Sequence, residues 1–251
     1  MRSGLPTADT MSEPTQPTTQ LPFAFELTRS TSRDDFVPGL ANDAALAFID
    51  GWPHWRARVG AIWGPSGSGK THLSQIWRVA SDAIEIAPSA LSIESIAELM
   101  PGTAVLMDGA GDVTNGAPLF HLINFTYQSQ GWLLLTGEPA PQRWPTSVPD
   151  LHSRLTAVTG ASLELPDEAL MARVLLKLSA DRQLKFPEAL IAYLVPRLRR
   201  SFADAEKLVA LMDYLALEKK RNVSIETASR ALRQLYDERN GQSADNPDGM
   251  G

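Results

Sequence analysis

The clearest signal in this 251-residue chain is the octapeptide Gly64-Pro65-Ser66-Gly67-Ser68-Gly69-Lys70-Thr71. It fits the pattern G-x-x-x-x-G-K-S/T, and it lies between an apolar segment at residues 59–63 and a segment at 71–79 that can begin a helix. Glycines let backbone N–H groups surround phosphate oxygens, and the helix N-terminus adds a favourable dipole. The octapeptide is therefore predicted to be a phosphate-binding loop, in which Lys70 reaches the outer phosphates and the Thr71 hydroxyl can ligate Mg²⁺. The alternative is a Gly- and Ser-rich turn without a ligand.

Composition limits the kinds of protein this chain can be. Hydrophobic residues make up 43% of it, which is enough for a larger and a smaller domain with buried cores. The formal net charge of −6 argues against a surface that mainly neutralises DNA phosphates. With no cysteine, the chain has no disulfide and no thiolate metal site. It lacks a membrane-length apolar run and a secretion signal, so we expect no membrane contact and a cytoplasmic location.

Residues 26–165 alternate short apolar runs with helical patterns. Strands that are apolar throughout and alternate with helices form parallel sheets covered on both faces. The fold class is therefore α/β, a phosphate-loop domain with a parallel sheet flanked by helices. Strands are expected at residues 59–63, 83–87, 104–108, 132–136 and 158–165, and helices at residues 42–49, 71–79, 93–100, 118–130 and 151–155.

From residue 166 onward the pattern is only helical. Asp167, Ser201 and Ser224 can cap helix N-termini, and Pro196 should end or kink the second helix. Residues 166–238 are therefore predicted to form a small all-helical lid domain. Its helices are expected at residues 167–180, 187–198, 201–219 and 224–238.

Both ends of the chain are predicted to be disordered, at residues 1–19 and 239–251, because they are polar and carry few bulky apolar side chains. The leader ends in the apolar segment Gln20-Leu21-Pro22-Phe23-Ala24-Phe25. This segment can pack on the protein's own core. Alternatively, it is a linear motif that docks into the apolar groove of a partner.

A phosphate loop in an α/β domain, followed by a helical lid, resembles the AAA+ class of ATPases. The resemblance implies that Asp108, at a strand end, is the Walker B acid that holds Mg²⁺ together with Thr71. It also implies that Thr136 is the sensor 1 residue beside the γ-phosphate of bound ATP. Phe36 and Val37, upstream of the loop, are expected to line the nucleotide base. The alternatives for Asp108 and Thr136 are a helix cap and a structural hydroxyl.

One acid of the AAA+ pattern is missing. Hydrolysing members of the class usually carry a second acid directly after the Walker B residue, where it orients the attacking water. Here that position is Gly109, and Gly111 intervenes before Asp112. The chain is therefore predicted to have weak or no ATPase activity of its own.

The sensor 2 arginine is also missing from the pattern. The best alignment with that segment covers residues 200–206 and puts Ala203 where the arginine should be. Arg199 or Arg200 is the alternative.

Residues 151–155 carry the Ser-Arg-Leu/Phe pattern of the arginine-finger segment in this class. Such an arginine enters the nucleotide site of a neighbouring subunit and stabilises charge on the γ-phosphate. The resemblance thus implies that Arg154 is a finger that acts in trans. A surface arginine paired with a local acid is the alternative.

Three segments, at residues 35–37, 133–141 and 149–155, resemble the DnaA family of replication initiators and, more closely, the Hda group that inactivates DnaA. The resemblance covers residues 20–238. Hda proteins carry an N-terminal Gln-Leu motif for the sliding clamp of the replicative polymerase, its DNA polymerase III beta subunit. Residues 20–25 resemble this motif, although Ala24 separates its two phenylalanines. The clamp contacts would come from Gln20, Leu21, Pro22, Phe23 and Phe25.

The implied function is regulatory inactivation of DnaA. The chain would promote hydrolysis of DnaA-bound ATP while it is held on the DNA-loaded clamp, and so limit over-initiation. Its own ligands would be ADP or ATP with Mg²⁺, and a homodimer is compatible with the class. The first alternative is a self-sufficient AAA+ ATPase such as a helicase loader or a DnaA-like initiation factor. The second is a DNA-binding initiator fragment, supported only by the basic clusters Arg197, Arg199, Arg200 and Lys219, Lys220, Arg221. Nothing after Glu238 is expected to form the helix-turn-helix domain of DnaA, so no sequence-specific DNA binding is expected.

Overall fold

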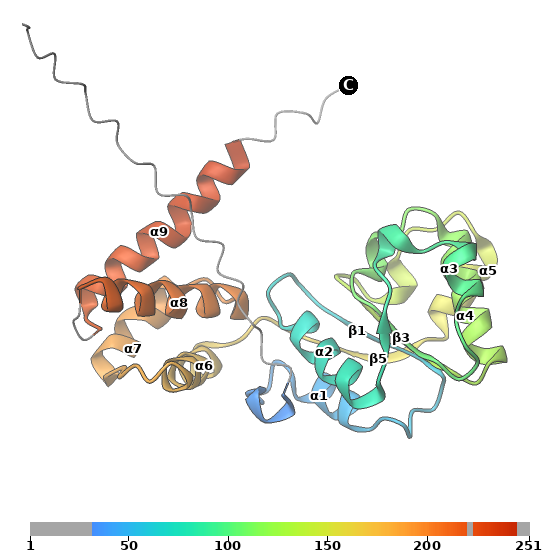
Figure 1. Ribbon diagram of the computed structural model, residues 1–251, viewed down its shortest axis with the longest axis horizontal. Helices are drawn as coiled ribbons and strands as arrows, with labels where there is room; N and C mark the ends of the chain where they lie inside the picture. Colours follow the sequence, from blue (N-terminus) through green and yellow to red (C-terminus); the bar gives the residue numbers. More distant parts are fainter. Residues whose placement is uncertain (1–31, 220–222, 245–251) are drawn as a thin grey trace, which may run out of the picture.

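The computed structural model describes residues 32–219 and 223–244. Figure 1 shows the helices α6 to α9 gathered on one side of the molecule and the sheet with α1 to α5 on the other. The predicted clamp motif at residues 20–25 lies outside the described residues. No described helix has the length and apolar character needed to cross a membrane.

The described residues form a five-stranded sheet in the order β2-β3-β4-β1-β5, and the paired strands are parallel. The register puts Ile62 opposite Thr136 and Met107 opposite Leu135. The phosphate loop follows β1 and Asp108 follows β3, so both lie where the parallel strands have their carboxyl ends, beside the end of β4. The strands are β1 Val59–Trp63, β2 Ile84–Glu85, β3 Ala104–Met107, β4 Trp132–Gly137 and β5 Thr159–Ser162.

Successive strand residues point to opposite faces of the sheet, and each face has its own core. In β3, Val105 and Met107 join the core with α3, α4 and α5, whereas Leu106 joins the core with α1 and α2. Helices thus cover both faces, as expected for strands that are apolar throughout. The predicted α/β class is confirmed. The helices are α1 Asp43–Asp50, α2 Lys70–Ser81, α3 Ile93–Ala97, α4 Gly116–Gln128 and α5 Pro149–Thr156.

Several elements are shorter than predicted, among them the strand expected at residues 83–87, which covers only Ile84–Glu85, and the helix expected at residues 187–198, which covers only Glu188–Leu194. The helix expected at residues 93–100 ends at Ala97, because Pro101 has no N–H to bond to the Ala97 carbonyl and also disfavours helical backbone at Met100. The strand expected at 158–165 covers only Thr159–Ser162, since β1 is its one partner in the described sheet and ends at Trp63.

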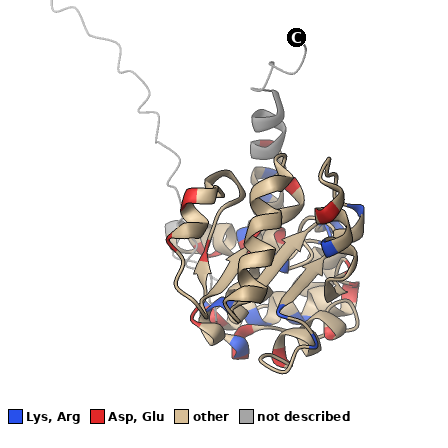
Figure 2. Ribbon diagram, turned by 90° about the vertical axis from the view of Figure 1, so that its right-hand side faces the viewer, with Lys and Arg blue, Asp and Glu red and all other residues tan. Residues whose placement is uncertain are grey.

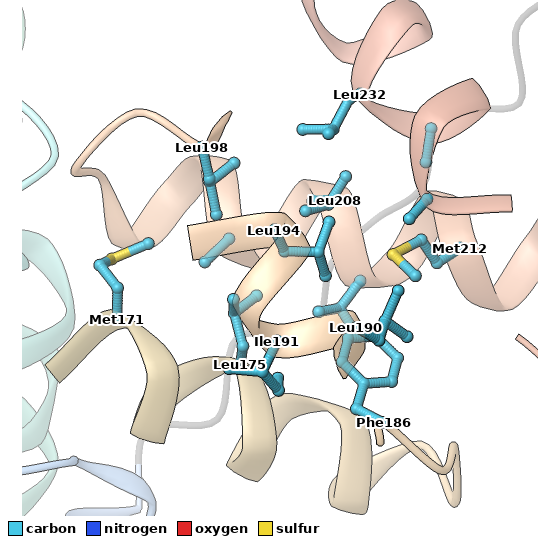
Figure 3. Close-up of a cluster of buried hydrophobic side chains, with 14 of the residues drawn as sticks. Met171, Leu175, Phe186, Leu190, Ile191, Leu194, Leu198, Leu208, Met212 and Leu232 are labelled. Carbon is cyan, nitrogen blue, oxygen red and sulfur yellow. The ribbon is translucent and has the colours of Figure 1, made fainter. Parts of the chain in front are cut away.

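The remaining described helices pack around a separate core, in which side chains from α6, α7, α8 and α9 point toward one another (Figure 3). Asp167 caps α6 by accepting a 2.7 Å hydrogen bond from the Leu170 N–H. Ser201 and Ser224 cap α8 and α9 with 3.3 Å hydrogen bonds from the Asp204 and Thr227 N–H groups, so the three predicted caps are confirmed. These helices are α6 Glu168–Asp181, α7 Glu188–Leu194, α8 Phe202–Lys219 and α9 Ile225–Ala244.

The ends of α7 and α9 test two further predictions. Helix α7 stops at Leu194, and a 3₁₀ turn with Pro196 follows it, as predicted. Helix α9 continues to Ala244, so the predicted helix end at Glu238 is wrong. A glycine such as Gly241 costs only about 1 kcal/mol in a helix, too little to end one that is already formed.

Candidate functional site

The octapeptide forms the turn between β1 and the first residues of α2. Gly67 and Gly69 have φ values of 82° and 96°, in the left-handed region that glycine tolerates best. Gly69 is also the N-cap of α2, so the loop's N–H groups and the start of the helix converge on one spot. This arrangement can receive the phosphates of a nucleotide.

Lys70 folds back over the loop. Its Nζ donates hydrogen bonds to the carbonyl oxygens of Gly64, at 2.7 Å, and Pro65, at 3.0 Å. Burial lowers the pKa of Lys70, and the carboxylates of Glu138, Asp108 and Asp112 oppose this effect. The ammonium group is thus held at the loop and has three acids in its surroundings.

Three predicted site residues meet at Asp108. The Thr71 hydroxyl donates to Asp108 Oδ2 at 2.8 Å, and the buried Thr136 hydroxyl donates to Asp108 Oδ1. Thr136 also accepts a 2.8 Å hydrogen bond from the Gly109 N–H. Mg²⁺ prefers oxygen ligands and is commonly held by one or two protein groups plus substrate phosphates. The Thr71 hydroxyl and the Asp108 carboxylate, side by side beneath the phosphate loop, fit this ion.

A cavity of about 320 Å³ opens next to the loop, between the α/β part and the helices α6 and α8. Phe36 and Val37 line it, as do the loop residues Ser66, Gly67, Gly69, Lys70 and Thr71. A lining that combines a phosphate loop with apolar groups suits a nucleotide. Of the predicted loop residues, Gly64 and Pro65 instead accept hydrogen bonds from Lys70, and Ser68 is buried.

Several lining residues come from the lid or lie beside it and were missed by the sequence analysis. Lys177 of α6 bridges the two parts, since its Nζ lies 2.7 Å from a carboxylate oxygen of both Asp35 and Asp181. Its i,i+4 spacing to Asp181 is an ordinary helix pattern, so nothing local indicates that it lines a cavity. The missed lining residues are Asp35, Asn42, His72, Val174, Lys177, Leu178, Asp181, Phe202 and Glu206.

The start of α8 touches the phosphate loop directly. The Phe202 N–H donates a 3.1 Å hydrogen bond to the Gly67 carbonyl, and Ala203 lines the cavity. The two arginines named as alternatives for sensor 2 point elsewhere. Arg199 lies over the Tyr236 ring, 5.1 Å from its centroid, and Arg200 lies 3.6 Å from Glu168.

Arg154 is exposed on α5, which Figure 1 places at the opposite end of the molecule from the lid helices. Its guanidinium lies 5.8 Å from the centroid of the Tyr127 ring. Among the ion pairs of the described residues, none involves Arg154. Figure 2 shows basic and acidic residues interspersed along the ribbon of this part of the molecule. Arg154 therefore does not belong to the chain's own cavity.

No protein-family model matches this chain. It is 22% identical over 116 residues to the chromosomal replication initiator protein DnaA of Caldanaerobacter subterraneus, and 24% identical over 117 residues to that of Thermoanaerobacter pseudethanolicus. Each match covers 46% of this chain and 26% of the relative, so the chain matches about a quarter of the initiator's length.

Solved structures resemble the chain over most of its length. Domain III of DnaA from Thermotoga maritima has a TM-score of 0.71 at 20% identity, covering 82% of this chain and 96% of that domain. AMPPCP-bound DnaA from Aquifex aeolicus has a TM-score of 0.64 at 19% identity, covering 81% and 69%. The RuvB branch migration motor of Thermotoga maritima has a TM-score of 0.62 at 19% identity, covering 82% and 72%. The chain has the fold of these AAA+ proteins, a parallel sheet flanked by helices with a C-terminal helical region.

Proposed function

We propose that this chain is a nucleotide-binding regulator of a DnaA-type replication initiator. It promotes hydrolysis of the initiator's ATP while a sliding clamp on DNA holds it in place. Three separate parts of the chain carry the proposal: the cavity, the exposed Arg154 and the leader motif.

The chain's own ligand is an adenine nucleotide, ADP or ATP, with Mg²⁺. The left-handed glycines of the loop, Lys70 and the Thr71–Asp108 pair support this assignment. DnaA structures of the same fold contain AMPPCP, an adenine nucleotide analogue. Lys70 holds the outer phosphates, Phe36 and Val37 border the base, and Mg²⁺ adds positive charge beside the phosphates.

The trans-acting role depends on one observation, the position of Arg154. Its guanidinium is exposed, has no ion pair among the described residues, and belongs to a helix remote from the chain's own cavity. An arginine in this setting is available to the nucleotide of a neighbouring molecule. There its planar, always-charged fork stabilises charge that develops on the transferred phosphoryl group.

The clamp contact comes from residues 20–25, with Gln20, Leu21, Pro22, Phe23 and Phe25 as the anchors. Their sequence and their place at the end of a polar leader support this role. A clamp that encircles DNA would raise the local concentration of this chain around DNA-bound initiator.

Phosphate release in a reconstituted mixture tests the proposal. We expect DnaA-bound ATP to be hydrolysed quickly only when this chain, the clamp and DNA are all present. A mixture without the clamp should react slowly, and so should one without this chain. Stimulation that does not require the clamp would contradict the tethered mechanism, and no stimulation in the full mixture would contradict the proposed function.

A further inference from the structure

The short segment between α7 and α8 carries three exposed arginines that do not line the nucleotide cavity, Arg197, Arg199 and Arg200. Residues 189–203 include these cations and no acid, so the segment is locally basic although the whole chain has a net charge of −6. A cluster of charges is often only a solvated surface. The way in which the arginines are held therefore decides whether they can serve a partner.

Leu198 fixes this segment to the lid. Its side chain is buried in the lid core, among the side chains of the other lid helices (Figure 3). The backbone at Leu198 is extended, with φ −89° and ψ 136°. Neighbouring side chains of an extended segment point to opposite sides. Arg197 and Arg199 therefore both leave the segment on the side away from the core, where they are exposed.

Each of these two arginines lies over a tyrosine ring. The Arg197 guanidinium is 4.1 Å from the centroid of the Tyr193 ring, and its Nη1 donates a 2.9 Å hydrogen bond to the Tyr193 carbonyl. The Arg199 guanidinium is 5.1 Å from the centroid of the Tyr236 ring. Both distances are within the range of cation–π attraction. The rings thus restrict where the two guanidinium groups can lie.

The Tyr236 hydroxyl also fixes the backbone between the arginines. It accepts a 2.9 Å hydrogen bond from the Arg199 N–H and donates one of 3.4 Å to the Arg197 carbonyl. Tyr236 belongs to α9, so the segment is tied to a helix that is 37 positions further along the chain. Side chains that are ordered before a partner arrives lose less conformational entropy on binding.

The positive charges of these arginines are hardly neutralised by the protein itself. No ion pair within the described part of the chain involves Arg197 or Arg199. Arg200 lies 3.6 Å from Glu168, but both side chains are largely exposed, and such surface pairs contribute little. A tyrosine ring covers only the face of a guanidinium group, so N–H groups at its edge stay available. This planar fork matches the oxygens of a phosphate group.

We propose that this arginine–tyrosine face, formed by Arg197, Arg199 and Arg200 with Tyr193 and Tyr236, binds the phosphate backbone of duplex DNA without sequence preference. Closely spaced cations suit a partner with closely spaced anionic charges, and contacts to phosphates carry no sequence information. A membrane surface fits less well, because it would need apolar side chains to insert, and residues 189–203 expose no large one. The inference goes beyond the proposed function and requires neither Arg154 nor the nucleotide cavity.

Fluorescence anisotropy with the full chain and a labelled duplex tests the inference, without nucleotide, clamp or DnaA. At about 0.1 M salt we expect a Kd on the order of 10⁻⁴ to 10⁻⁶ M, as is typical of non-specific contacts. Two duplexes of unrelated sequence should bind equally well. The logarithm of the binding constant should fall linearly with the logarithm of the salt concentration, with a slope of about −0.9 for each phosphate that is neutralised.

Three double variants identify the residues responsible. Arg197→Ala with Arg199→Ala should weaken binding to both duplexes alike and make the salt slope shallower by about 1.8, the share of two phosphate contacts. Arg197→Lys with Arg199→Lys should keep the slope, because counterion release depends on charge. The matched control, Arg56→Ala with Arg143→Ala, removes the same charge at exposed arginines of the α/β part and should bind like wild type. Melting temperatures near that of wild type show that the variants are folded.

Several results would overturn the inference. One is a wild-type chain that does not bind duplex even at low salt. Another is an equal loss of binding in the control variant, because net charge alone would then explain the effect. Binding to vesicles of anionic lipid, but not to duplex, would assign the face to a membrane and contradict the inference as well. The action of Arg154 on DnaA is measured separately, so the proposed function can hold or fail independently of these results.

Discussion

The Thr71 hydroxyl donates a 2.8 Å hydrogen bond to the carboxylate of Asp108, although 37 positions separate the two residues. Parallel pairing of β3 with β4 and of β4 with β1 produces this contact, because it aligns the ends of the strands that precede both residues. A hydroxyl and a carboxylate at one point provide the two protein ligands that an Mg²⁺ bound to nucleotide phosphates needs.

Replacing Thr71 by Val should therefore weaken nucleotide binding through the metal. Valine keeps the shape of the side chain but has no oxygen. We expect the affinity for Mg·ATP to fall about tenfold or more, a typical loss when support of a metal is removed. Thr71→Ser should keep most of the affinity, since it retains the hydroxyl. In EDTA, calorimetry should find equal ATP affinities for wild type and Thr71→Val, and a persistent difference would speak against the metal role.

Gly67→Ala should loosen the contact between the lid and the phosphate loop. A Cβ at this position would lie 2.6 Å from Ser201 Oγ, and the backbone φ of 82° adds strain. Gly102 provides the matched control, because its φ is 84° and a Cβ there would meet no atom within 4 Å. Strain of this kind costs about 1–3 kcal/mol at either site. Thermal unfolding should show a larger loss for Gly67→Ala, and ATP affinity should fall only in that variant. Equal effects in the two variants would mean that the lid contact contributes nothing.

The clamp motif should be separable from the folded part. Changing Gln20, Leu21 and Phe23 together to Ala should abolish clamp binding in surface plasmon resonance. The melting temperature and ATP affinity should stay within error of wild type, because a motif on a polar leader contributes little to a core. A triple variant that aggregates or melts much earlier would instead assign these residues to core packing.

The local parts of this fold could be predicted from sequence, and the long-range contacts could not. Strand β1 was predicted at its observed bounds, since an apolar run directly before a Gly-rich loop is a local signal. The contact of Ser201 with Gly67 depends on how the lid docks, and no periodicity encodes that.

Some residues of the candidate site could likewise be predicted from local sequence, and others could not. Lys70, Thr71 and Asp108 could be assigned from motif spacing alone, because the strand ends define where they meet. Lys177 and its ion pair with Asp35 join two parts of the chain that are far apart in sequence. Lys177 and Asp35 are close because α6 lies beside the segment that precedes α1, and only the structure shows this.

Arg154→Ala tests the central claim most directly. With clamp, DNA and DnaA held constant, we expect this variant to cut the stimulated release of phosphate from DnaA-bound ATP by about 10³-fold, if arginine-finger magnitudes apply. Arg154→Lys should rescue it poorly, since a point charge cannot replace the bidentate fork. The matched control is Arg233→Ala, at an exposed arginine on α9. It should stimulate like wild type, and all three variants should keep wild-type ATP and clamp affinity. Stimulation at the wild-type rate by Arg154→Ala would contradict the proposed action in trans.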